Sequence, residues 1–155
     1  EKLSSSQELI LLREKILLMR ELWTRDEAEF DGEIEKLEKS WSWPKPIQKP
    51  HPPIVLGGAV GKKTAQHIAE FCDGWMPLGR YGDVKRGLNL IKDAAAKIGR
   101  NLDNFELSMF CVAPIKQDQV MELSEQGFNR IILPLPAEDA ATVLPILDKY
   151  SSLIQ

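Results

Sequence analysis

The residues best suited to bind a ligand form a glycine-rich loop in the first half of the chain. Residues 57–64 read Gly-Gly-Ala-Val-Gly-Lys-Lys-Thr, after a short apolar segment and before a helical pattern. Glycines let backbone amides approach a ligand closely, and the start of a helix offers free N–H donors with a partial positive charge. Two lysines and a hydroxyl strengthen this pattern, which predicts an anion-binding site made of Gly57, Gly58, Ala59, Val60, Gly61, Lys62, Lys63 and Thr64.

Two other interpretations of the 57–64 loop stay open at this point. The glycine spacing is similar to that of the GxxxxGK[ST] nucleotide-binding loop, in which the hydroxyl residue directly follows the lysine. Lys63 occupies that position here and the hydroxyl is displaced to Thr64, which disfavours a nucleoside triphosphatase. The remaining interpretation is a turn between a strand and a helix whose lysines are simply solvated.

Acid–base and metal chemistry have little support in the sequence. His51 lies between prolines and His67 lies within a helical pattern, and neither has a carboxylate or cysteine partner at a useful spacing. We therefore favour packing or surface roles for both and nominate no catalytic base. The two cysteines, Cys72 and Cys111, lack ligand-spaced neighbours, so we expect no metal site and free thiols in a cytoplasmic protein. The acidic residues near Asp31 are interpreted as a solvated hairpin face: Glu27, Glu29, Glu33 and Glu35.

Composition excludes several classes of protein. The chain has 155 residues, of which 43% are hydrophobic and 28% charged, as in a globular domain. A net charge of −3 gives no reason to expect a nucleic-acid or anionic-membrane partner. No apolar run approaches the roughly 18–20 residues that span a bilayer. Because residue 1 is Glu1 and a helix is predicted almost at once, we expect a piece of a longer protein or a processed product.

The first third of the chain must lead into the loop. Apolar residues recur every three or four positions over residues 5–23, which predicts a helix with one apolar face. Asp31-Gly32 predicts a two-residue hairpin turn within residues 27–37, because both residue types tolerate positive φ. Residues 41–53 contain five prolines, which forbid a helix or an interior strand and predict a stiff connector.

From residue 54 onward the pattern alternates regularly between strand and helix. We expect strands at residues 54–56, 74–78, 105–112 and 130–135, and helices at 62–71, 84–98, 119–126 and 138–153. In the helix at 62–71 the inward residues are expected to be Ala65, Ile68, Ala69 and Phe71. Nearly all-apolar strands suit a parallel sheet in an α/β protein. Four βα units fit either a flavodoxin-like open sheet or half of a (β/α)8 barrel, and the pattern does not separate the two.

Several blocks of sequence resemble the luciferase-like monooxygenase superfamily. They are ELWT at 21–24, FDGE at 30–33, PKPIQKP at 44–50, PPIVLGG at 52–58 and DGWMP at 73–77. The chain is most similar to the coenzyme F-420-dependent oxidoreductases of that superfamily, whose members are single barrels of roughly twice this length. The resemblance implies one domain over residues 1–155, with a helix in 1–24, a hairpin and connector in 25–53, and a half-barrel in 54–155.

The same resemblance carries the functional expectations. It implies that the chain begins after strand four of the barrel and supplies strands five to eight, with the 57–64 loop holding the phosphate of F-420 or FMN. The absent strands carry most contacts to the cofactor ring and substrate, so the chain alone is expected to be inactive. Arg80 is expected either to meet the phosphate or acidic tail of the cofactor or to be solvated, and Trp75 to pack in the core.

A different hypothesis is a non-catalytic assembly module. A half-barrel exposes sheet edges and an inner face, so two copies are expected to pair into a barrel-like homodimer. The alternative partner is a separate N-terminal half.

Overall fold

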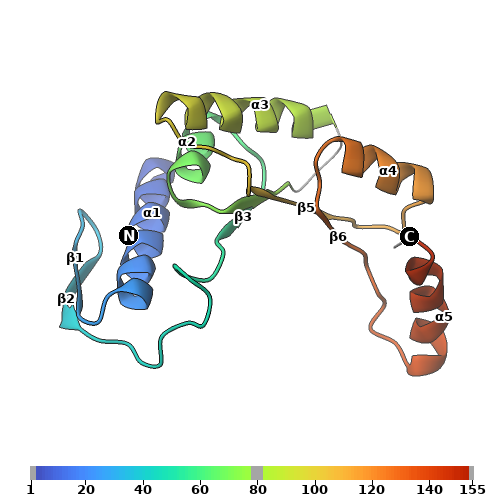
Figure 1. The fold of residues 1–155 in the computed structure, drawn as a ribbon, viewed down its shortest axis with the longest axis horizontal. Coiled ribbons are helices and arrows are strands. Elements are labelled where there is room, and N and C mark those ends of the chain that lie inside the picture. The colour runs from blue at the N-terminus through green and yellow to red at the C-terminus, as the bar shows by residue number, and fades with distance from the viewer. Residues whose placement is uncertain (1–2, 78–81, 154–155) are drawn as a thin grey trace.

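The computed structural model describes residues 3–77 and 82–153, with side chains from residue 84 onward in the second range (Figure 1). Every predicted helix and strand is present, although most of the strands are shorter than predicted. In chain order the elements are α1 Ser5–Thr24, β1 Ala28–Asp31, β2 Lys36–Ser40, β3 Val55–Gly57, α2 Lys62–Phe71, β4 Gly74–Met76, α3 Gly82–Lys97, β5 Glu106–Phe110, α4 Gln117–Glu125, β6 Arg130–Ile132 and α5 Ala140–Ser151.

Strands β3, β4, β5 and β6 form one parallel sheet whose spatial order follows their order in the chain. A flavodoxin-like sheet reverses its strand order at a switch point, whereas a β/α barrel keeps neighbouring strands consecutive. The observed order is therefore the one that a barrel requires. Gly74 permits the tight pairing of β4 with β5, since a Cβ there would lie 2.6 Å from the Glu106 carbonyl oxygen.

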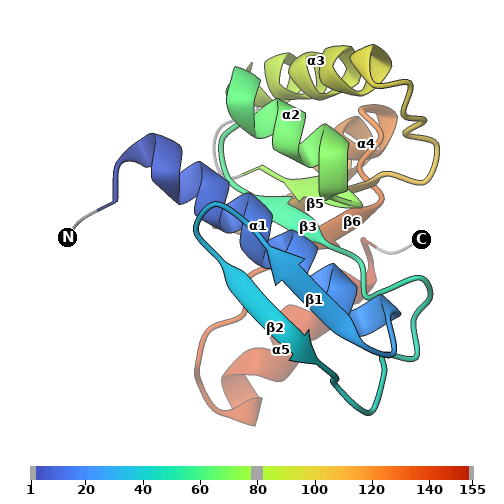
Figure 2. The same ribbon diagram turned by 90° about the vertical axis from the view of Figure 1, so that its left-hand side faces the viewer.

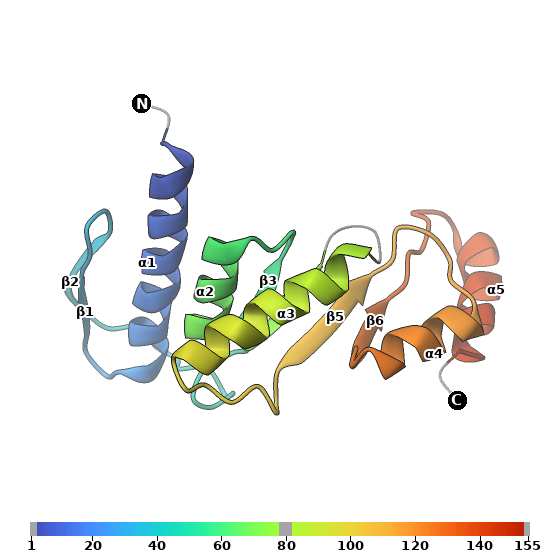
Figure 3. The ribbon, with the colours of Figure 1, turned by 90° about the horizontal axis from the view of Figure 1, so that it is seen from above.

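The helices that follow the strands lie on one side of the sheet. Figure 3 shows α2, α3 and α4 in succession along it. The core lies between these layers, because every second strand residue points toward the helices. Leu107 and Met109 of β5 are buried there against Ile68 of α2, Ile91 of α3 and Leu123 of α4. The predicted inward residues of α2 are confirmed, at 0–2% exposure: Ala65, Ile68, Ala69 and Phe71.

The opposite face of the sheet, which we call the inner face, has no helix of the described chain packed on it (Figure 1). Strand alternation directs Ser108 and Phe110 of β5 to this face, with their register partners Arg130 and Ile132 of β6. Phe110 is 43% exposed and Ile132 36% exposed. At the other end of the same strands, Glu106 Oε1 accepts a hydrogen bond from the Ser108 hydroxyl at 2.6 Å and lies 3.1 Å from Arg130 Nη1.

Helix α1 packs against the hairpin β1–β2 (Figure 2) and also contacts α2, with Ile16 and Leu17 against the core. The hairpin is present as predicted, but the prediction of an Asp31-Gly32 turn is wrong. Asp31 still pairs with Lys36, so the tip of the hairpin lies at Glu33 and Ile34. No described non-glycine residue has a positive φ, and neither does Gly32. The N–H groups at this tip are instead bound by the carboxylate of Glu14 on α1.

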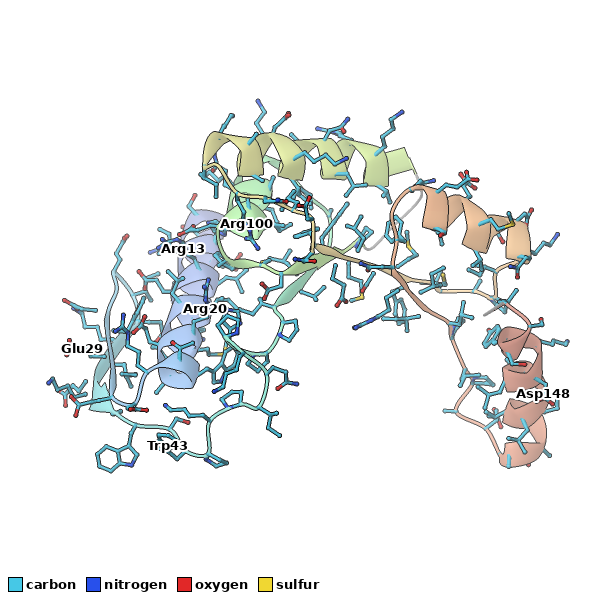
Figure 4. All side chains as sticks on the ribbon, in the orientation of Figure 1. Arg13, Arg20, Glu29, Trp43, Arg100 and Asp148 are labelled. Atoms are coloured by element: carbon cyan, nitrogen blue, oxygen red, sulfur yellow. The ribbon has the colours of Figure 1, made fainter. Side chains whose placement is uncertain are left out.

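The connector between β2 and β3 is extended and largely exposed. Trp43 projects from it away from the rest of the chain (Figure 4). The Lys45 Nζ lies over the Trp43 ring, 5.1 Å from the ring centroid. Lys45 Nζ also donates to the Leu22 carbonyl oxygen at 2.8 Å, which ties the connector to the end of α1. None of the helices in the described ranges has both the length and the apolar character needed to cross a bilayer.

Candidate functional site

The 57–64 loop lies at the carboxyl end of the parallel sheet. β3 ends at Gly57 and α2 begins at Lys62, so residues 58–61 form the turn between them. Both lysine side chains, Lys62 and Lys63, are exposed, while Thr64 is half-buried. In β/α folds the ligand sites lie at this end of the strands. The eight residues predicted for the anion site therefore span the end of β3, this turn and the start of α2.

The N-terminus of α2 is open to a ligand. Its N-cap residue is Gly61, which makes no side-chain cap, and no acidic residue lies in the first turn. The first α-helical hydrogen bond runs from the Ala65 N–H to the Gly61 carbonyl oxygen, so the preceding first-turn amides have no α-helical partner. By contrast, Ser4 caps α1 and Asp139 caps α5 through their side chains. Uncapped amides, the helix dipole and two lysines together favour an anion.

Space and backbone conformation also suit a close ligand. A Cβ on Gly58 or Gly61 would meet no atom within 4 Å, so the surface of the loop is free at both positions. Gly58 has φ +123°, a conformation that residues with a side chain rarely adopt. Its N–H donates to the Met76 carbonyl oxygen at 2.9 Å, which anchors the start of the loop to β4. The loop thus combines an anchored first residue with exposed donors.

Two predicted residues near the loop have different outcomes. Arg80 lies outside the described residues, so its role stays a prediction. Trp75 was predicted to pack in the core rather than to stack on a ligand, and it is 1% exposed. Sequence reasoning missed that its indole Nε1–H donates to the Gly58 carbonyl oxygen at 2.9 Å. Trp75 belongs to the DGWMP block that carried the family resemblance, but no local sequence pattern indicates its hydrogen bond to Gly58.

His51 lies at the other end of the sheet from the loop, and His67 lies one helical turn after Thr64 on α2. His51 is buried and His67 half-buried, which agrees with the packing roles favoured for them. His51 is 7% exposed, and its Nδ1 lies 2.9 Å from the Pro52 carbonyl oxygen. The structure also brings Asp73 Oδ2 to 3.9 Å from that nitrogen, a neighbour that the sequence spacing did not indicate. Both residues precede their strands, at the sheet end opposite the loop. Burial lowers the pKa of His67, whose ring lies 5.5 Å from that of Phe71.

The acidic hairpin residues are largely solvated, as predicted. Glu27, Glu29 and Glu33 are exposed, and Glu27 forms a surface ion pair with Lys39 at 3.0 Å. Sequence reasoning missed Glu14 on α1, a carboxylate only 5% exposed. It accepts hydrogen bonds from the backbone N–H groups at the hairpin tip rather than facing a ligand.

Cys72 and Cys111 are free and buried. Burial raises the pKa of the Cys72 thiol to about 12 and also raises that of Cys111. In the part of the chain that the structure describes, no three His, Cys, Asp or Glu side chains form a metal-binding group. A groove of about 460 Å³ lies between α2 and α3 on the outer layer and meets the loop only at Lys62.

A parallel sheet with consecutive strands and a helix layer on one side is the arrangement found in α/β proteins of the β/α-barrel type. The family model described as luciferase-like monooxygenase matches residues 5–142, and the chain belongs to this family. The resemblance seen in the sequence blocks is thereby confirmed.

Curated relatives agree with this assignment. An uncharacterised protein of Mycobacterium tuberculosis is 37% identical over 135 residues, covering 84% of this chain and 46% of its own length. An F-420-dependent glucose-6-phosphate dehydrogenase of Gordonia bronchialis is 35% identical over 95 residues, covering 59% of this chain and 27% of its own length. The chain thus spans less than half the length of the curated relatives it matches.

Solved structures show the same fold. An F-420-dependent secondary alcohol dehydrogenase, in complex with an F-420–acetone adduct, superimposes with a TM-score of 0.61 at 22% identity. That match covers 79% of this chain and 38% of the dehydrogenase. The monooxygenase RslO1 from Streptomyces bottropensis gives a TM-score of 0.54 at 19% identity, covering 97% of this chain and 46% of its own.

Proposed function

We propose that this chain supplies the cofactor-phosphate side of a luciferase-like oxidoreductase that uses F-420 or FMN. The observation that carries the proposal is the uncapped N-terminus of α2 at the carboxyl end of β3, with Lys62 and Lys63 exposed beside it. The phosphate would be held by the backbone amides of the loop and by these lysines. Arg80, outside the described residues, is proposed to contribute to the same site.

The residues present fit a phosphate group. Open space at Gly58 and Gly61 lets the backbone approach a phosphate oxygen, and no carboxylate lies in the first turn of α2 to repel it. When bound, the cofactor would supply the redox chemistry, while the loop would hold and orient it. F-420 is favoured over FMN, because two of the relatives described above are F-420-dependent by name.

The chain is proposed to be one domain that forms strands five to eight of an eight-stranded barrel. The consecutive parallel order of β3 to β6 and the one-sided helix layer support this interpretation. The length of the relatives supports it as well, since the matched region covers 46% of the Mycobacterium tuberculosis protein. Catalysis then needs the remaining strands, and the chain by itself is proposed to be inactive. The free, buried cysteines support a reducing compartment such as the cytoplasm.

The phosphate contribution can be tested with pairs of ligands that differ in the part that carries the phosphate. FMN is compared with riboflavin, which lacks only the phosphate, and F-420 with its deazaflavin chromophore, which lacks the phosphate and the acidic tail, by fluorescence titration at low salt. We expect the phosphorylated member of at least one pair to bind more tightly, and backbone resonances of residues 58–64 to shift on binding. Equal affinities within both pairs, together with unperturbed loop resonances, would contradict the proposal.

Variants then test the loop itself. Lys62→Ala and Lys63→Ala each remove one exposed positive charge beside the uncapped helix start, and Lys149→Ala removes one from the last turn of α5. We expect each loop variant to weaken binding of the phosphorylated ligand roughly two- to tenfold, as for a single solvated charge contact. The Lys149 control is expected to leave binding unchanged.

The homodimeric assembly module remains a second candidate, favoured by the inner face. Phe110 and Ile132 lie side by side on it, and each is more than a third exposed. Within the described residues, β3 and β6 each have a strand partner on one side only. Sedimentation over a concentration series would detect pairing. Phe110→Asp is expected to abolish it, whereas Met121→Asp, at a 57% exposed position on α4, is expected to have no effect.

A further inference from the structure

Trp75 is the side chain that fastens the anion-binding loop to the rest of the sheet. Its indole Nε1–H donates to the Gly58 carbonyl oxygen at 2.9 Å. The next residue of β4, Met76, accepts a hydrogen bond from the Gly58 N–H at 2.9 Å through its carbonyl oxygen. Two consecutive residues of β4 therefore hold both polar groups of one loop residue.

The held residue is the one at which the chain leaves the strand. Gly58 has φ +123°, and a Cβ there would have no atom within 4 Å. Crowding therefore does not explain the glycine, whereas the backbone conformation does. The two hydrogen bonds from β4 keep this conformation in place, and residues 59–61 lead directly from it to the open end of α2.

The indole is itself held on its other side by α3. A Cβ on Gly87 would collide with Trp75 Cη2 and would lie 3.0 Å from Cζ2 and 3.2 Å from Cζ3. Trp75 is 1% exposed, so the ring has no free volume into which it can retreat. Gly87 thus makes room on α3 for the ring that reaches Gly58.

We propose that Trp75 is a positioning residue of the phosphate site and that it acts through its hydrogen bond to Gly58. Gly87 on α3 leaves the space that the indole ring needs for this contact. This inference rests on the function proposed above. An indole N–H buried at this position loses its partner if the loop moves, so the hydrogen bond penalises other loop conformations. A loop already fixed before binding pays less entropy when the phosphate arrives.

The hydrogen bond can be separated from the packing of the ring. Replacing Trp75 with 3-benzothienyl-alanine keeps nearly the same shape and removes only the N–H, and Trp75→Phe serves as a second variant. Gly87→Ala pushes on the ring from α3 without altering the loop sequence. Trp41→Phe, at a 75% exposed position on the connector, is the matched control.

Two readouts are needed, one with ligand and one without. In each cofactor pair, the preference for the phosphorylated member is expected to fall about three- to tenfold in the benzothienyl and Gly87→Ala proteins, as expected for one lost hydrogen bond. Affinity for the phosphate-free members is expected to stay unchanged. Without ligand, the Gly58 amide is expected to exchange with deuterium at least several-fold faster in both proteins, and Trp41→Phe is expected to match the wild type in every measurement.

The outcomes separate this inference from the function on which it rests. If the wild type shows no preference for phosphorylated ligands, the proposed function fails and the positioning role fails with it. If the wild type shows the preference and the benzothienyl protein keeps it in full, with unchanged Gly58 exchange, the positioning role alone is overturned.

Discussion

The carboxyl carbon of Glu14 lies 2.5 Å from the point that a Cβ would occupy on Gly32. Glu14 can come so close because residue 32 has no side chain, and it then accepts hydrogen bonds from the N–H groups of Glu33, Ile34 and Glu35 at 2.6, 2.9 and 2.8 Å. A side chain of α1 thus satisfies the backbone N–H groups of the hairpin tip.

Gly32→Ala is expected to destabilise the protein by about 1–3 kcal/mol, the cost of forcing an extra methyl into a filled site. The buried Glu14 carboxylate would have to move and would lose amide donors. Urea denaturation measures the change, and Glu33→Ala is the control because it keeps the backbone N–H and removes only an exposed side chain. The control is expected to stay within about 0.5 kcal/mol of the wild type. Equal stabilities for all three proteins would show that Glu14 relocates freely.

Stability is expected to fall in mild acid because of the same carboxylate. The Glu35 N–H, followed by those of Ile34 and Glu33, lowers the pKa of Glu14 below the ordinary glutamate value. The folded protein therefore favours the charged form, so the stabilisation is present above the ordinary pKa and is lost as pH falls through the lowered value. Glu14→Gln should flatten the pH dependence of the free energy of unfolding between about pH 5 and pH 3. A Gln variant with the wild-type slope would assign the acid sensitivity to other carboxylates.

Arg100 is expected to stabilise the end of α2 opposite the 57–64 loop. Its guanidinium donates to the carbonyl oxygens of Ala69 at 2.8 Å and Cys72 at 2.6 Å, and Figure 4 shows it beneath α3. Arg100→Ala should cost roughly 1.5–3 kcal/mol, because charged donors to helix-end carbonyls are lost. Arg100→Lys should recover only part of this, since an ammonium lacks the planar fork. Thermal denaturation with Arg86→Ala as an exposed control on α3 checks the ranking of the three variants.

The thiols are expected to be inert in the folded protein. Cys72 is 0% exposed with a pKa raised to about 12, and Cys111 is 7% exposed with its pKa raised by burial. A thiol reacts as its thiolate, so Ellman's reagent at pH 8 should label neither residue until a denaturant is added. Rapid labelling of the native protein, with Cys72→Ser and Cys111→Ser identifying the site, would reveal local opening of the core.

The order of helices and strands was largely predictable from the sequence, because hydrophobic periodicity depends on neighbours within a few positions. The four inward residues of α2, from Ala65 to Phe71, followed from their spacing alone. The position of the 57–64 loop between a strand and a helix was equally predictable, since its glycines fit neither element and its flanking residues fit both patterns. Arg80 belongs to the same prediction but lies outside the described residues.

The tertiary structure decided what local spacing does not encode. The consecutive strand order separates a barrel from an open sheet, and it depends on which strands pair across whole helices. The hairpin tip lies at Glu33-Ile34 instead of the predicted Asp31-Gly32. The backbone N–H groups at this tip donate to the carboxylate of Glu14, a residue far away in the sequence that local turn patterns do not include. The fastening of Gly58 by Trp75 has the same origin. The sequence by itself determined the elements and the position of the 57–64 loop between a strand and a helix. Only the packing of α1, β4 and α3 decided which side chains hold the hairpin tip and the loop in place.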